Sequence, residues 1–257
     1  MFAIYKKEMR SFFINPIGFV FVGIYLALAA LLCCYTTIQS NSYDTATYFV
    51  IMIFALIILI PLLTMRSFAE ERKLKTEQLL LTSPVSITSM VLGKFFAAFT
   101  MFLGCVLTTC LNFIPLFIVG KAEREGDPYS TTHIGPEGAE IIGNVIAVIL
   151  IGAAFIAIGL FISSLTENQL SAAVITIAVI LAMVVIGFVN SIGTDAEGNR
   201  LISNYAVRAV IDWISVFNRF SAFTYGVFDI AAAVYYLSLA GVFIFLTVRI
   251  YEKRRWS

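Results

Sequence analysis

The chain has 257 residues, of which 60% are hydrophobic and only 13% are charged, and its formal net charge is +1. Soluble domains carry about 25% charged residues, so this composition excludes an ordinary soluble domain and predicts an integral membrane protein. A net charge so close to zero argues against a nucleic-acid partner. The four cysteines all fall inside apolar runs, a placement that indicates neither a disulfide framework nor a metal site. We expect a single transmembrane domain over residues 1–257.

The N-terminal residues 1–15 interleave aromatic and aliphatic side chains with lysine, glutamate and arginine. This pattern predicts a helix that lies in the membrane interface and ends at Asn15-Pro16. The apolar run Ile17–Tyr35 that follows is longer than the about 7–15 residues of a signal-peptide core. We therefore interpret it as a retained membrane span.

Six segments have the length and apolar character that a helix needs to cross the hydrocarbon core, about 20 residues. They are Ile17–Ile38, Thr47–Met65, Val91–Val119, Ile141–Ser163, Leu170–Ser191 and Ala231–Ile250. The predicted fold class is therefore an all-α polytopic membrane protein with six transmembrane helices. Lys94 and Arg249 lie near enough to the ends of their spans for their side chains to snorkel to the interface.

The distribution of lysine and arginine predicts the orientation of the chain. If the N-terminus is inside, ten of these residues lie in the inner segments and five in the outer loops. Because cytoplasmic loops of membrane proteins are enriched in positive charge, both termini are expected to be cytoplasmic.

The longest charged interval on this predicted cytoplasmic side is the loop of residues 66–90, after the second span. Residues 70–77 within it hold three acids and three bases, and Glu71 and Lys75 have the i,i+4 spacing of an ion pair that would stiffen a helix at a partner contact. The alternative is a solvated connector. A second inner turn, Ser164–Gln169, joins the fourth and fifth spans.

Residues 192–230, before the last span, are too charged to cross the membrane and too apolar to be fully solvated. Apolar residues recur there at helical spacing, namely Val207, Val210, Ile211, Ile214 and Phe217. We expect an amphipathic or re-entrant helical region at the outer surface, with Phe217, Phe220, Phe223 and Tyr225 as candidate outer-gate residues. An interfacial anchor without a gating role is the alternative.

No nucleotide-binding Walker loop, GxSxG or HExxH motif occurs in the chain. No charged residue lies near the middle of a predicted span, where ion-coupled transporters usually place one. We therefore expect no catalytic, cofactor-binding or metal-binding residues and no enzymatic activity of the chain itself. The energy for any transport has to come from a partner.

Two sequence motifs carry a resemblance to a known family. The first is Phe68–Val85 with the following Gly93-Lys94, and the second is Phe220–Asp229, which leads into the last span and Arg254-Arg255-Trp256. With these motifs and six spans, the chain resembles the permease subunits of type-2 ABC exporters, most closely the branch related to gliding-motility and nitrous-oxide-reductase-maturation permeases.

This resemblance implies that the loop after the second span holds a coupling helix that contacts a separate ATPase. The implied contact residues are Glu70, Glu71, Arg72, Glu77 and Thr82, with Glu167 of the second turn and the N-terminal helix as further contacts. A helix with charges of both signs suits this role, because cross-interface ion pairs set orientation and partner choice.

The resemblance also implies the partners. ATP and Mg²⁺ would be bound by the ABC ATPase subunit, and the permease would form the pathway with a second copy of itself or a sister permease, in contact with membrane lipid. An accessory extracytoplasmic protein and a multi-pass location in a prokaryotic plasma membrane fit the same branch. One alternative is an ATPase-linked subunit that acts mechanically or regulatorily on a partner protein, and another is a secondary transporter or channel.

Overall fold

The computed structural model describes residues 1–39, 43–78, 85–126, 135–192, 215–224, 226 and 228–256. These residues form helices joined by turns and short connections, without a β-strand. Six of the described helices are long and apolar enough to cross a membrane. Each of the six predicted spans lies over one of them, so the predicted all-α fold class is confirmed.

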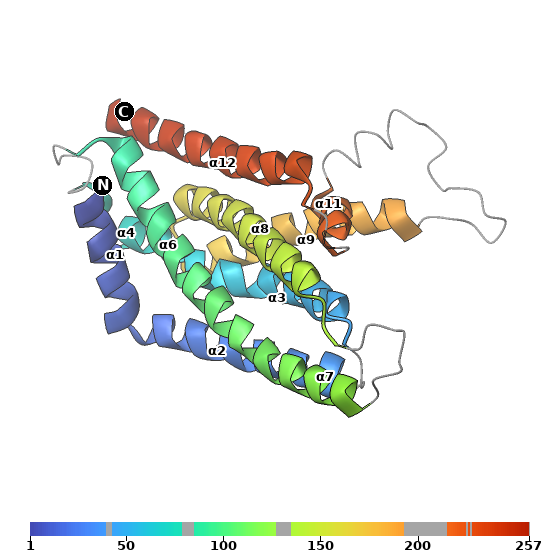
Figure 1. Cartoon of the computed structure of the whole chain (residues 1–257). Helices are drawn as coiled ribbons and strands as arrows, with labels where there is room; N and C mark the ends of the chain where they lie inside the picture. Colours follow the sequence, from blue (N-terminus) through green and yellow to red (C-terminus); the bar gives the residue numbers. More distant parts are fainter. Residues whose placement is uncertain are drawn as a thin grey trace.

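The helices follow the chain from the N-terminus in a simple order (Figure 1). They are α1 (Phe2–Ile14), α2 (Pro16–Cys33) with a π-helical turn (Cys34–Ile38), α3 (Ala46–Thr64), α4 (Ala69–Lys73), α6 (Ile87–Thr109), a 3₁₀ turn (Cys110–Phe113), α7 (Ile114–Gly126), α8 (Gly138–Leu165), α9 (Gln169–Ile192), α11 (Val216–Thr224) and α12 (Ile230–Trp256). The third predicted span is therefore a rod made of α6 and α7. Pro115 explains the break between them, because proline lacks the N–H that would continue the α-helical bonding.

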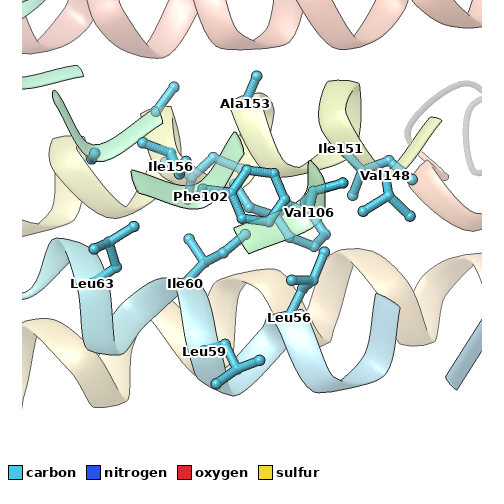
Figure 2. Packing of buried hydrophobic residues seen from close by; sticks show 14 of the residues in the cluster. Leu56, Leu59, Ile60, Leu63, Phe102, Val106, Val148, Ile151, Ala153 and Ile156 are labelled. Carbon is cyan, nitrogen blue, oxygen red and sulfur yellow. The ribbon is translucent and has the colours of Figure 1, made fainter. Parts of the chain in front are cut away.

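Helix α8 lies at the centre of the bundle, in contact with α3, α6, α9, α11 and α12. In its membrane-crossing part, 72% of the residues are buried, and it is apolar on all sides, as a core helix should be. Figure 2 shows Phe102 and Val106 of α6 between α3, which contributes Ile60, and α8, which contributes Ile156.

Helix α1 packs against α6 and α2 and runs across the direction of α2 rather than along it (Figure 1). Asn15 has an extended backbone with φ −81° and ψ 139°, and Pro16 occupies the first turn of α2, a favoured position for proline. The predicted end of the first helix at Asn15-Pro16 is therefore confirmed. Both termini, α1 and α4 lie at one end of the bundle, here called the terminal end, whereas α7 and α11 lie at the opposite end (Figure 1).

Candidate functional site

The loop after α3 folds into the five-residue helix α4 at the terminal end. Ser163 of α8 fixes its start, because the Ser163 hydroxyl accepts hydrogen bonds from the N–H groups of Phe68 (3.2 Å) and Ala69 (3.1 Å) and donates one to the Met65 carbonyl (3.2 Å). Phe68 is buried against the ring of Tyr251 in α12, at 4.9 Å between ring centroids. The loop is therefore packed onto the bundle at its beginning.

A buried lysine lies beneath this loop. Lys94 of α6 has only 2% of its side chain exposed, and its Nζ lies 2.8 Å from Oε1 of Glu8 in α1 and 3.0 Å from Oε1 of Glu71 in α4. The same Nζ donates a hydrogen bond to the Ser67 carbonyl at 2.7 Å and lies over the Phe68 ring. The expectation that Lys94 snorkels to the interface is therefore wrong, because two carboxylates compensate its charge inside the protein.

Glu71 has a second cationic partner in α1. Nζ of Lys7 lies 3.1 Å from Oε1 of Glu71. Burial lowers the pKa of Lys7, but the charge of Glu71 and the hydrogen bond to it outweigh this effect, so the pKa is raised above 10.5 and Lys7 stays protonated. The predicted pair of Glu71 with Lys75 does not form, because α4 ends at Lys73 and Lys75 has a left-handed backbone with φ 58°.

Two further ion pairs join the loop to distant elements. Arg72 lies 2.9 Å from Glu167, in the turn between α8 and α9, and donates a hydrogen bond to the Leu165 carbonyl. Glu77 lies 3.1 Å from Arg254 of α12, which also donates a hydrogen bond to a carbonyl at the end of α8. The structure thus brings Arg72 and Glu167, two predicted contact residues from separate segments, into direct contact.

The remaining predicted coupling residues differ in their surroundings. Glu70 forms two 2.6 Å hydrogen bonds with the guanidinium of Arg66. Thr82 lies outside the described residues. Most acidic and basic side chains of the predicted contact set are thus bound within the chain itself.

Among the described residues of the loop, the segment 73–76 projects from the bundle into solvent, and it is here called the loop tip. Lys73, Lys75 and Thr76 are exposed, and Leu74 between them is 64% exposed. Our sequence reasoning missed Leu74. The available signal was an apolar residue flanked by two lysines within a strongly polar stretch, since contact sites between proteins often have apolar centres and polar rims.

At the opposite end of the bundle, Phe220 and Phe223 of α11 are buried, with 1% and 0% of their surface exposed. Helix α11 packs against α8, α9 and α12, and the Tyr236 hydroxyl donates a hydrogen bond to the Val216 carbonyl at its start. The side chain of Phe217 and all of Tyr225 lie outside the described residues, as does the predicted apolar stripe at 207–214.

Within the described part of the chain, no group of histidine, cysteine, aspartate or glutamate side chains is arranged to hold a metal ion. The geometry supports a site for a protein partner, made of charged elements that meet at the terminal end.

Comparison with family models identifies the protein family of this chain. The model described as ABC-2 family transporter protein matches residues 35–250, from the end of the first span to the last turns of α12. The chain belongs to the ABC-2 transporter family. As an ABC-2 transporter protein it is a multi-pass transmembrane component of an ABC transporter, and family membership implies an ABC ATPase subunit as partner. A comparison with curated proteins finds no match.

Proposed function

We propose that the chain is the permease subunit of an ATP-driven exporter and that its loop tip docks on the ATPase subunit. The observation that carries this proposal is the set of ion pairs that join the loop to three distant parts of the bundle. Lys94 lies in α6, Glu167 in the turn between α8 and α9, and Arg254 in α12. A displacement of α4 by a partner would therefore act on these elements directly.

The chemistry of the loop tip favours a protein partner over solvent alone. Leu74 exposes an apolar side chain between Lys73 and Lys75. A cleft with an apolar floor and an acidic rim on the ATPase would complement it, because charges at the rim steer association and buried apolar anchors supply affinity. ATP and Mg²⁺ would be bound by that subunit.

The finer features of the proposal follow from the orientation and the resemblance. We place the terminal end, with both termini, in the cytoplasm of a prokaryotic cell, since the lysine and arginine bias favours it. We further propose a pathway formed with a second copy or a sister permease, and membership in the branch of the gliding-motility and nitrous-oxide-reductase-maturation permeases. An accessory extracytoplasmic protein belongs to the same proposal.

The test is co-purification of the ATPase subunit with the tagged chain from its native membrane. A Leu74→Asp variant is expected to weaken the association by about 2 kcal/mol, or about 30-fold, because it removes an apolar anchor and introduces a charge. Leu74→Met, which keeps an apolar side chain of similar volume, should retain the ATPase.

Glu71→Arg is a poorer test, because it would place a third cation beside Lys94 and Lys7 and disturb the fold of the loop. Retention of the ATPase by Leu74→Asp would refute the loop tip as the contact. Absence of any ATPase from the wild-type preparation would refute the exporter proposal itself. Once the complex is isolated, ATP hydrolysis stimulated by a transported substrate would distinguish transport from purely mechanical action on a partner.

A further inference from the structure

A groove of about 760 Å³ opens at the terminal end between the start of α6 and the last two turns of α12. Figure 1 shows these two helix ends beside each other. The described lining residues are Ser86, Ile87, Thr88, Arg249, Glu252, Lys253 and Arg255. This volume is within the range of small-molecule sites, about 300–1,000 Å³, and the groove is separate from the loop tip at 73–76.

The groove carries an excess of positive charge. Of its four charged residues only Glu252 is acidic, and it forms a 2.8 Å ion pair with Arg249. Lys253 and Arg255 are exposed and form no ion pair with a described residue. Arg254, between them in sequence, instead bonds inward to Glu77 and the end of α8. Within the described part of the chain, these two cations of the groove therefore have no acidic partner.

The opposite wall of the groove offers hydrogen-bond donors. Ser86 and Thr88 are both exposed there. Ser86 is the N-cap residue of the 23-residue helix α6, yet its side chain makes no capping hydrogen bond. The first N–H groups of a helix have no partner within the helix, and they favour an anion together with the helix dipole. Both walls thus suit a negatively charged group.

The groove is continuous with an apolar strip on α12. Val242, Phe245 and Leu246 are 54%, 54% and 38% exposed, and Arg249 lies one turn further along the same face. The Arg249 guanidinium lies over the Phe245 ring at 4.9 Å, so the cations begin where the apolar strip ends. In a membrane-spanning helix such a strip contacts acyl chains, which places the groove at the level of lipid headgroups.

From these features we infer that the groove binds the phosphate-bearing headgroup of an anionic glycerophospholipid, with the acyl chains along the α12 strip. The phosphate would contact Lys253, Arg255 and the hydroxyls of Ser86 and Thr88. The two exposed cations, Lys253 and Arg255, favour a headgroup with net negative charge, such as phosphatidylglycerol, over zwitterionic phosphatidylcholine. This inference does not depend on the ATPase contact.

The test places the full chain in nanodiscs of phosphatidylcholine with a minor fraction of phosphatidylglycerol and measures the retained lipids by native mass spectrometry. The wild-type chain should retain phosphatidylglycerol preferentially. A Lys253→Gln/Arg255→Gln variant should lose about 30-fold in affinity, because each cation near the membrane surface contributes about fivefold. A Lys253→Arg/Arg255→Lys variant, with the charge kept, should retain the lipid.

The matched control is Lys73→Gln/Lys75→Gln, which removes the same charge at the same end of the bundle but outside the groove. It should retain phosphatidylglycerol as the wild type does. Equal retention by the Lys253→Gln/Arg255→Gln variant, or an equal loss in the control, would refute the groove as a lipid site. Displacement of the lipid by added inorganic phosphate would also refute it and assign the groove to a soluble anion.

Discussion

At the residue scale, the buried lysine Lys94 shows how a charge is accommodated in this bundle. A cation inside a membrane protein is costly unless acids or carbonyls compensate it. Here Glu8, Glu71 and the Ser67 carbonyl do so at 2.7–3.0 Å. Since these partners come from α1 and from the loop that contains α4, the lysine links its own helix α6 to two segments that are far apart in the sequence.

Lys94→Met should therefore lower the free energy of unfolding by about 3 kcal/mol, because it removes the buried cation that two half-buried carboxylates share and leaves them only the exposed Lys7. The measurement is the unfolding transition in detergent, monitored through the loss of the helical circular-dichroism signal. Arg249→Met is the control, since Arg249 is 62% exposed and its surface pair with Glu252 should contribute under about 1 kcal/mol. An equal, small effect of both substitutions would show that Lys94 does not stabilise the fold.

At the element scale, α4 depends on its neighbours. A helix of five residues is too short to be stable in isolation, so its conformation has to come from packing and hydrogen bonds to the bundle. Its acids, Glu70 and Glu71, lie at its beginning, and its bases, Arg72 and Lys73, lie at its end. This arrangement interacts favourably with the helix dipole. Ser163 adds the two bonds that satisfy N–H groups at its start.

Ser163→Ala should release the start of α4, because the N–H groups of Phe68 and Ala69 lose their acceptor at a buried site. We expect a cost of about 1–3 kcal/mol, seen as faster hydrogen exchange of the amides at 68–69. Ser164→Ala is the matched control, since that hydroxyl donates only to the Phe161 carbonyl of its own helix. Unchanged exchange in Ser163→Ala would show that the Phe68 contacts and the ion pairs of the loop fix its start without Ser163.

An element of this structure could be predicted from the sequence where residues close to it in the chain determine its conformation. The six spans and the helix of residues 1–15 follow from apolar length and pattern, which are local properties. The partners of Glu71 do not, because Lys7 is 64 residues away in the sequence and Lys94 lies in another helix, and either lysine could equally have faced solvent. Local spacing favoured Lys75 as the partner, but the left-handed backbone at Lys75 ends the helix too early.

The candidate site was predictable in location but not in detail. The density of charged residues indicated that the loop is a candidate contact site, and the family resemblance predicted a helix within it. Which side chains are bound internally and which are exposed is a property of the packed bundle, so the exposed Leu74 emerged only from the structure. Likewise, the aromatic residues before the last span singled out Phe220 and Phe223 as candidate gate residues. Their burial could not be predicted, because it depends on the packing of α11 against α8, α9 and α12.

At the scale of the whole molecule, α8 organises the bundle because small residues let its neighbours approach closely. Gly159 faces Thr64 of α3, and a Cβ atom at this glycine would overlap the Thr64 hydroxyl and lie 2.9 Å from the Thr64 Cβ. Thr64 is fully buried, and its hydroxyl donates to the Ile60 carbonyl. Thr64 therefore cannot move aside without a shift of the α3 backbone.

Gly159→Ala should separate α3 from α8 and destabilise the fold by about 2 kcal/mol, the usual cost of overpacking a core. Because α3 leads directly into the loop, the same variant should also increase hydrogen exchange at 66–73, which a purely local defect would not. Gly104→Ala is the matched control, since a Cβ at that exposed position of α6 meets no atom within 4 Å. If Gly159→Ala unfolds at the same midpoint as Gly104→Ala, close approach of α3 to α8 is not required for the bundle, and the loop is positioned by its ion pairs, by Ser163 and by the packing of Phe68.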